Sequence, residues 1–193
     1  MRRFCILLAA ALLAPLPASA QVTEFPNLLP RNWSAEATGL EDKSLGLLLP
    51  CGINRITANL RLSNPTKRPQ IVPTVGLVFA LPMPKIEQVI LRIEAGANGR
   101  PELTLKKHGG PKLVPDIRFA APVAYGKDVV VVVRWHPDGR IDVTAGGRTQ
   151  GMALSAVPAD VEFLVQGGKG DITNIRTGWE GAGQATACAR PLR

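Results

Sequence analysis

The basic residues best placed to bind a ligand gather in one predicted hairpin. The stretch 128–148 reads DVVVVVRWHPDGRIDVTAGGR, in which Arg134 and His136 precede a Pro-Asp-Gly turn and Arg140 follows it. Because side chains along a strand alternate between two faces, these three residues are expected outside and Trp135 inside, in the core. An arginine can hold a carboxylate or a sulfate through two parallel hydrogen bonds. The hairpin therefore predicts a small basic surface, and the alternative is a solvated strand face that binds nothing.

Three more side chains are candidates for the same surface. Arg176 would add positive charge, and Tyr125 or Trp179 would offer a ring on which a sugar could stack. The predicted ligand-binding residues are therefore Arg134, His136, Arg140, Arg176, Tyr125 and Trp179.

No recognisable catalytic constellation occurs in the sequence. Glycoside hydrolysis needs two carboxylates that flank the scissile bond. The nearest acidic pairs, Glu41-Asp42 and Asp160-x-Glu162, are expected in a loop and at the start of an apolar strand. The chain has one tyrosine and two histidines, and it lacks the Gly-x-Ser-x-Gly turn of serine hydrolases. We therefore expect a non-catalytic protein.

Metal-binding motifs are absent as well, so no cofactor is expected. The sequence has neither an H-E-x-x-H nor a C-x-x-C pattern, which disfavours zinc. Calcium stays open, because single carboxylates in loops can build an oxygen site together with backbone carbonyls. The acids available for such a site are Asp116, Asp128, Asp138 and Asp171, for which the alternative is that they are solvated loop acids.

Residues 1–20 have the layout of a secretory signal peptide. Two arginines precede an apolar run over 4–13, and a small-residue site at 18–20 follows two prolines. This layout predicts cleavage before Gln21 and export to the periplasm or out of the cell. The apolar run is too short to span a bilayer comfortably, and no later stretch is apolar enough to do so.

Export also decides how the cysteines are interpreted. Cys5 leaves with the signal peptide, so Cys51 and Cys188 remain. An isolated pair in an oxidising compartment is most simply a disulfide, and the lack of a C-x-x-C spacing disfavours free thiols or a redox pair. The predicted bond closes a loop over nearly the whole domain, and it implies that the chain near residue 51 returns beside the C-terminus.

The charge balance favours anionic partners. Lysine and arginine number 23 against 15 acidic residues, and the net charge of +8 becomes +6 when Arg2 and Arg3 leave with the signal peptide. Such a balance suits acidic polysaccharide, another anionic envelope polymer or a membrane surface. The single tyrosine and the lack of a basic block disfavour nucleic acid. The alternative is that the charge only maintains solubility.

Alternating apolar residues predict an all-β fold. The segment 21–41 has weak periodicity and is expected to be an arm with one strand around Trp33, ahead of a single domain over 42–193. The run Val129–Val133 is typical of a strand covered on both faces. No stretch has convincing helical spacing, so an antiparallel β-sandwich with little helix is expected. Inward-facing sets are predicted at Ile56, Ala58, Leu60 and Leu62, at Val75, Leu77, Phe79 and Leu81, at Val89, Leu91 and Ile93, and at Leu103 and Leu105.

Two motifs carry a family resemblance. One is the hairpin in which a valine strand ends in a tryptophan and is followed by a D-G turn and a short strand closed by glycine. The other is FLVQGGKGDITNIRTGWEG at 163–181. Both resemble concanavalin A-like jelly-roll domains, with laminin-G-like glycan-binding modules as the nearest pattern, over roughly residues 54–181. The resemblance implies two stacked antiparallel sheets with neighbouring termini, a geometry that a Cys51–Cys188 bond fits.

Three functions follow, in order of preference. The first is an exported, non-catalytic module that binds carbohydrate or an anionic envelope polymer through the predicted basic surface. The second is a structural or protein-interaction domain of the cell envelope, with no small ligand, in which edge strands and the segment 21–41 make the contacts. The third is an enzyme that acts on polysaccharide.

Overall fold

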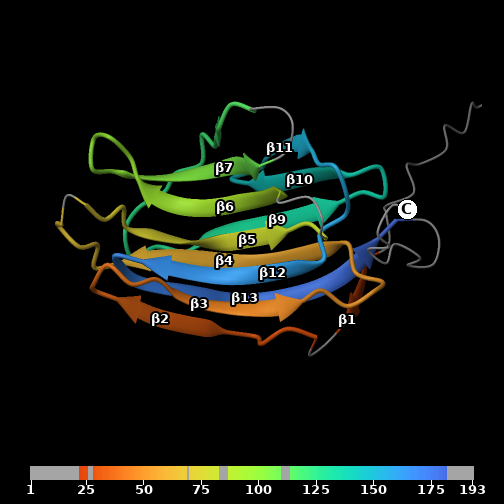
Figure 1. Cartoon of the computed structure of the whole chain (residues 1–193), viewed down its shortest axis with the longest axis horizontal. Coiled ribbons are helices and arrows are strands. Elements are labelled where there is room, and N and C mark those ends of the chain that lie inside the picture. Colours follow the sequence, from red (N-terminus) through yellow and green to blue (C-terminus); the bar gives the residue numbers. More distant parts are fainter. Residues whose placement is uncertain (1–21, 26–27, 69, 83–86, 110–113, 182–193) are drawn as a thin grey trace, which may run out of the picture.

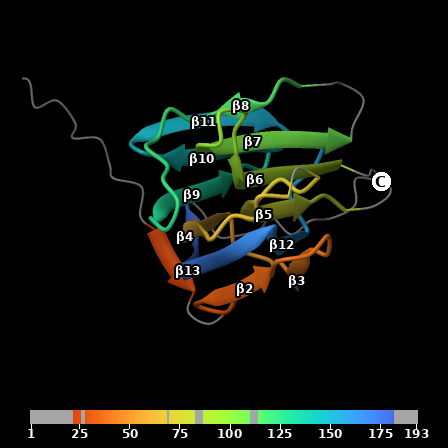
Figure 2. The same cartoon turned by 90° about the vertical axis from the view of Figure 1, so that its left-hand side faces the viewer.

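Two antiparallel sheets packed face to face make up the protein. The computed structural model describes residues 22–25, 28–68, 70–82, 87–109 and 114–181. Figure 1 shows the strands running side by side, and Figure 2 shows the two sheets as separate layers. This arrangement confirms the predicted all-β, jelly-roll sandwich. The described part of the chain holds no helix of the length and hydrophobicity needed to cross a membrane.

The two sheets are named A and B. Sheet A contains β1 (Val22–Phe25), β2 (Trp33–Ala37), β4 (Arg55–Ser63), β9 (Val129–Trp135), β10 (Arg140–Ala145), β11 (Arg148–Ala153) and β13 (Gly168–Glu180). Sheet B contains β3 (Lys43–Leu48), β5 (Thr74–Ala80), β6 (Glu87–Ala95), β7 (Pro101–Gly109), β8 (Ile117–Arg118) and β12 (Asp160–Gln166). The order across sheet A is β1-β13-β4-β9-β10-β11, with β2 also paired to β13, and the order across sheet B is β3-β12-β5-β6-β7-β8.

The core lies between the sheets and is built from the alternating residues of each strand. In β4 every second residue is buried, and the four predicted inward residues from Ile56 to Leu62 are at most 1% exposed. The predicted inward residues of β5, β6 and β7 are buried as well. Trp135 is 2% exposed and its ring centroid lies 6.0 Å from that of Phe79, so it is a core residue as expected.

The valine run differs from the expectation that both of its faces are covered. Val129, Val131 and Val133 are buried, but Val130 is 56% exposed and Val132 is half-buried. The run is therefore covered on its inner face only, because nothing in the described chain packs on the outer face of sheet A at this point. The uninterrupted apolar pattern hid this asymmetry.

Two strands of the expected N-terminal arm, β1 and β2, belong to sheet A. The expected strand around Trp33 is β2, which pairs with the first half of β13. The strand β1 pairs with the second half of β13, from Thr177 to Glu180. Both are short and lie beside a long strand, so their pairing depends on contacts far away in the sequence.

A β-bulge in β13 decides which of its side chains face outward. Pairing with β4 is regular up to Thr173, shifts, and resumes at Arg176, so β13 has one residue more than β4 in this interval. Asn174 takes a left-handed φ of 53° there, and its N–H donates to Asn32 Oδ1 over 3.1 Å. The extra residue re-aims the strand, so that Asp171 before the bulge and Glu180 after it both point outward.

The predicted disulfide and signal peptide lie partly or wholly outside the described residues. Cys188 is among residues 182–193, so the Cys51–Cys188 bond stays a prediction, and so does the role of residues 1–20. One geometric consequence of the bond is met nearby. Asn54 exchanges two hydrogen bonds with the backbone of Glu180, at 3.0 and 2.8 Å, so the chain just after Cys51 does lie beside the end of β13.

Candidate functional site

The outer face of sheet A carries a row of charged residues that runs across the strands. Strand pairing places Gly178 on β13, Arg55 on β4, Arg134 on β9, Asp142 on β10 and Gly151 on β11 opposite one another. Five strands at the usual spacing of about 4.8 Å make this row roughly 19 Å long. It is called the charged row below, and it consists of Arg55, Arg134, His136, Arg140, Asp142 and Glu180.

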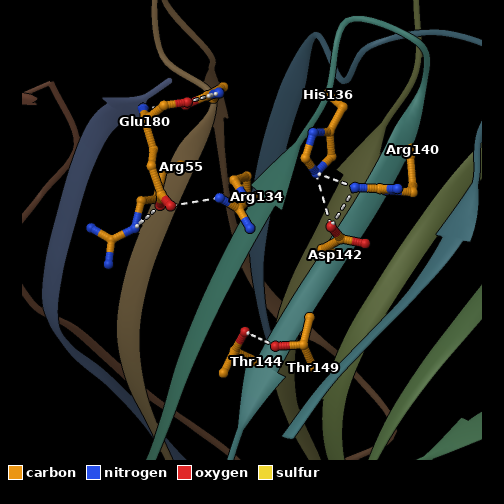
Figure 3. Close-up of polar contacts among 9 residues, drawn as sticks. Arg55, Arg134, His136, Arg140, Asp142, Thr144, Thr149 and Glu180 are labelled. Carbon is orange, nitrogen blue, oxygen red and sulfur yellow. Dashed lines mark hydrogen bonds and ion pairs between the residues drawn. The ribbon is translucent and has the colours of Figure 1, made fainter. Parts of the chain in front are cut away.

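One half of the charged row is a carboxylate held between two arginines. Glu180 Oε2 lies 3.3 Å from Arg55 Nε, and Glu180 Oε1 lies 2.5 Å from Arg134 Nη1. Figure 3 shows the Glu180 side chain reaching between the two guanidinium groups. The backbone of Glu180 is held by two hydrogen bonds with the Asn54 side chain, so the point from which the carboxylate extends is fixed.

The other half surrounds Asp142 at the end of the β9–β10 hairpin. Asp142 Oδ2 lies 2.8 Å from His136 Nε2 and 3.2 Å from Arg140 Nη2. The two basic groups also approach each other, at 3.3 Å. All three side chains converge in Figure 3. The turn holds them in place, because the backbone N–H of His136 donates to the carbonyl of Arg140 and the N–H of Arg140 donates to Asp138 Oδ1.

The residues of the predicted basic surface therefore lie where they were expected, but the surface that they form is not simply basic. Arg134, His136 and Arg140 do face outward on neighbouring strands. Each of them contacts a carboxylate, however, and the charged row balances three arginines with two acids. A row of this kind offers fixed hydrogen-bond acceptors as well as donors, which a bare basic face would not.

A less polar row lies beside the charged row. It runs from Arg176 through Thr57 and Val132 to Thr144 and Thr149. The two threonine hydroxyls on β10 and β11 are 2.7 Å apart (Figure 3). The exposed Val130 lies nearby. The outer face of sheet A thus combines a row of mostly uncharged threonine and valine side chains with the charged row.

Arg176 joins this face, but the two predicted aromatic residues do not. Arg176 is 65% exposed and lies 3.6 Å from Glu24. Tyr125 lies at the far end of β4, where the N–H of Gly126 donates to Leu62, seven residues or roughly 23 Å from Arg55 along the strand. Its hydroxyl donates to the carbonyl of Gly99, and burial raises the pKa of Tyr125. Trp179 is half-buried and points to the opposite side from Glu180, so it cannot stack on a ligand of the charged row.

The sequence analysis did not single out Glu180 as a site residue. Simple alternation through β13 gives Glu180 the wrong face, because the count fails at the bulge. The only sequence signal of the bulge is Asn174, since asparagine tolerates a left-handed conformation better than most residues do. That signal is too weak to find the bulge without the structure.

The four acids considered for calcium each contact a basic group or a backbone N–H. Asp116 lies 3.2 Å from Lys106, Asp128 and Asp171 lie 3.7 and 3.0 Å from Arg61, and Asp138 accepts from the backbone of Arg140. Burial alone would raise the pKa of Asp171, but hydrogen bonds from Ser34 and Arg61 and the Arg61 charge hold it below its ordinary value. Among the described residues, no three His, Cys, Asp or Glu side chains form a group able to hold a metal ion.

The acidic pair Asp160 and Glu162 faces outward on sheet B. Burial raises the pKa of Asp160, and the neighbouring Glu162 charge adds to this effect. Two carboxyl groups of which one has a raised pKa are a feature of glycosidase sites. These two residues lie on β12, on the opposite face of the molecule from the charged row.

Sheet B also carries charged groups on its outer face, and these are tied to one another. Glu94 is 8% exposed, and its carboxylate lies 2.6 Å from Arg92 and 2.8 Å from Lys106 and accepts from Thr104 over 3.0 Å. Burial favours a raised pKa for Glu94, but the bond from Lys106 and the Arg92 charge lower it below its ordinary value. This closed network leaves less free hydrogen-bonding capacity than the charged row does.

Two cavities involve strands of sheet A, and one of them lies on the charged row. This cavity, of about 480 Å³, is at the β10–β11 end and is lined by Asp138, Arg140, Asp142, Gly151, Met152 and Ala153. The other, of about 600 Å³, lies beside β1 and the β13 bulge, where its lining includes Glu24, Arg31, Asn32 and Arg176 and no residue of the charged row. The charged row is therefore hollowed at its β10–β11 end.

Comparison with known proteins shows similarity in structure only. No protein-family model matches the chain, and no curated protein matches it either. Among solved structures, the carbohydrate-binding module CBM66 from Bacillus subtilis is similar with a TM-score of 0.51 and 11% identity, over 75% of this chain and 93% of that chain. Alginate lyase Aly36B, solved in complex with an alginate tetrasaccharide, has a TM-score of 0.51 and 9% identity, over 76% of this chain and 80% of that chain. Porphyranase B from Zobellia galactanivorans has a TM-score of 0.50 and 12% identity, over 83% of this chain and 75% of that chain.

These similarities agree with the sequence motifs at the level of fold. Modules that bind carbohydrate and enzymes that act on polysaccharide share the same two-layer architecture, so architecture alone does not separate binding from catalysis. The chain has the jelly-roll fold of concanavalin A-like domains.

Proposed function

We propose that this protein is an exported, non-catalytic carbohydrate-binding protein whose ligand lies across the outer face of sheet A. The observation that carries the proposal is the charged row, in which donors and acceptors from four strands and the β9–β10 turn are held by their own ion pairs beside a row of threonine and valine side chains. A sugar ring has the same two properties, since its edge carries hydroxyl groups and its faces carry C–H groups. The jelly-roll fold supports a glycan ligand.

The balance of charge in the row selects the type of glycan. Three arginines and two carboxylates leave an excess of one positive charge, so a densely sulfated polymer would meet Glu180 and Asp142 as repulsive groups. A polymer rich in hydroxyl groups with sparse negative charge fits better. This narrows the acidic-glycan expectation drawn from the net charge of +8.

The proposal is tested by a glycan and polysaccharide array with the purified protein, in low and in moderate salt, with calcium and with chelator. We expect binding that survives moderate salt and chelation. A calcium requirement would move the site to the acidic loops. A blank array for a folded sample would contradict the proposal and favour the interaction-domain function, and release of reducing ends from a bound polymer would favour an enzyme.

A further inference from the structure

The cavity at the β10–β11 end of the charged row differs in character from the rest of the row. Its lining carries two carboxylates, Asp138 and Asp142, and one guanidinium, Arg140. The opposite end, around Arg55, Arg134 and Glu180, carries two guanidinium groups and one carboxylate. The row is thus polarised, with a small negative excess at its β11 end and a small positive excess at its β4–β9 end.

Small side chains on β11 keep this cavity open. Gly151 lies opposite Asp142, and an added Cβ at Gly151 would collide with Asp142 Oδ1 and lie 2.6 Å from the backbone oxygen of Ile141. Ala153, opposite Arg140, is also exposed and small. Because β11 is the edge strand of the sheet, nothing in the described chain closes the cavity from that side.

The hydrogen-bonding groups inside the cavity are fixed and incompletely used. His136 and Arg140 both contact Asp142 Oδ2, which leaves Oδ1 facing the space above Gly151 within the described part of the chain. A carboxylate oxygen accepts strong hydrogen bonds from hydroxyl groups, and the adjacent Arg140 can donate to a second oxygen of the same ring. Neighbouring hydroxyl groups of one sugar therefore match this pair.

We infer that this cavity is a subsite for an uncharged sugar ring with adjacent hydroxyl groups, and that the Arg55–Arg134 end takes a ring that carries a carboxylate. The inference rests on the proposed glycan-binding function and adds to it the orientation of the ligand along the charged row. A uronate in the cavity would place its carboxylate beside Asp138 and Asp142, whereas the same group meets two guanidinium groups at the other end. The ligand class is an oligosaccharide in which uncharged and acidic rings alternate.

The test compares three probes by calorimetry: a hyaluronan tetrasaccharide, in which uncharged and acidic rings alternate, cellotetraose, which is uncharged, and tetragalacturonate, in which every ring is acidic. The wild-type protein is expected to bind the alternating probe most tightly and tetragalacturonate least. Ala153→Leu fills the cavity from an exposed position. It should lower the affinity for the alternating probe about tenfold or more, as expected for loss of hydrogen bonds to charged groups. Ser44→Leu, at an exposed position on the edge strand β3, is the matched control and should have no effect.

A second variant keeps the test independent of cavity shape. Asp138→Asn keeps a side-chain oxygen that can accept from the backbone N–H of Arg140, and it removes one negative charge from the cavity. This variant should reduce the difference in affinity between tetragalacturonate and the alternating probe. If the wild type binds the alternating probe and neither variant changes the affinities, the subsite is wrong although the proposed function stands. If the wild type binds none of the three probes or any glycan on the array, both fail.

Discussion

Glu180 is the residue that turns two neighbouring arginines into a balanced, rigid surface. Arg55 and Arg134 are opposite each other on adjacent strands, where like charges repel. The carboxylate between them offsets that repulsion and sets the positions of both guanidinium groups. At the residue scale, the charge and geometry of the proposed binding surface therefore depend on a side chain that carries no positive charge.

Replacement of Glu180 by Gln should make the surface bind more densely charged polymers. The change leaves Arg55 and Arg134 without their acid, so affinity for a sulfated polysaccharide should rise by up to about fivefold at low salt, the range of partly exposed ion pairs. The measurement is a salt titration of binding to heparin. Glu36→Gln, which changes the net charge equally at an exposed position on β2, is the control. Equal behaviour of the two variants would show that Glu180 has no special role.

Glu87 should make the protein sensitive to acid. Its carboxylate is fully buried and contacts Lys107 at 2.6 Å and the Ser155 hydroxyl at 2.5 Å. Burial by itself raises the pKa of Glu87, but the bonds from Lys107 and Ser155 and the Lys107 charge lower it below 4.5. A carboxyl whose pKa is lowered on folding stabilises the protein fully above its unfolded value, and this contribution is lost as the pH falls through the folded value.

The free energy of unfolding of the wild type should therefore fall as the pH is lowered below about 4.5, the ordinary pKa of glutamate. That of Glu87→Ala should fall less over the same interval. At neutral pH, Glu87→Ala should cost about 1–3 kcal/mol, because Lys107 loses its carboxylate partner and keeps only the carbonyl of Ala153 as an acceptor. Urea unfolding at neutral pH and at about pH 3 measures both effects. A parallel pH dependence in the two proteins would contradict this account of Glu87.

At the scale of elements, the β13 bulge links the fold to the site. One additional residue between Thr173 and Arg176 is what brings Arg176 and Glu180 to the same face as Asp171. The bulge residues do not pair with β4. Instead Asn174 donates to Asn32, and Ile175 donates to the carbonyl of Arg31 over 3.0 Å. The loop between β1 and β2 thus stabilises the irregularity that the charged row requires.

The conformation of Asn174 gives a test of that link. Its φ of 53° suits asparagine or glycine and disfavours a β-branched residue. Asn174→Val should lower the free energy of unfolding by about 1–2 kcal/mol and should weaken glycan binding, whereas Asn174→Gly should leave both nearly unchanged. Thermal or urea unfolding and calorimetry of the same two proteins decide this. A harmless Asn174→Val would mean that the bulge adopts another backbone conformation.

Elements also show what could be predicted from the sequence and what could not. The inner faces of β4 to β7 and of the β9–β10 hairpin followed from alternation, because one face of each is buried in the core and the other is not. A strand around Trp33 was expected and is β2, but its pairing with β13 and the strand β1 did not follow, since a short strand is held by its partner and not by its own pattern. The face of Glu180 was unpredictable for a related reason: one unpaired residue reverses the alternation, and the pairing that reveals it is long-range.

At the scale of the whole molecule, the sequence predicted the fold but not the charge of the site. Net positive charge and outward arginines suggested a basic surface, and both features are present. Asp142 follows Arg140 by two residues on the same face of β10, so that contact belongs to the local pattern. The contacts of Glu180 with Arg55 and Arg134 depend on the order of strands across sheet A and on their register, which the local pattern does not contain.

The predicted Cys51–Cys188 bond should stabilise the whole sandwich. It would close a long loop, and the chain-entropy model gives such a bond about 4–5 kcal/mol. Reduction of the purified, oxidised protein should therefore lower its urea midpoint markedly, and Cys51→Ser with Cys188→Ser should reproduce the effect. Mass spectrometry of the alkylated, non-reduced protein checks the bond directly. Two alkylated thiols in that sample would refute it.

The measurement that tests the central claim most directly is calorimetry of one double variant against its matched control, with the glycan that binds best on the array. Arg134→Ala with Arg140→Ala removes two donors from the charged row. Arg68→Ala with Arg118→Ala removes the same charge from two exposed positions elsewhere. We predict that the first pair weakens binding at least about tenfold, the range for loss of hydrogen bonds to charged groups, while the second pair binds like the wild type. Equal affinities of the two double variants would contradict a glycan site on the outer face of sheet A.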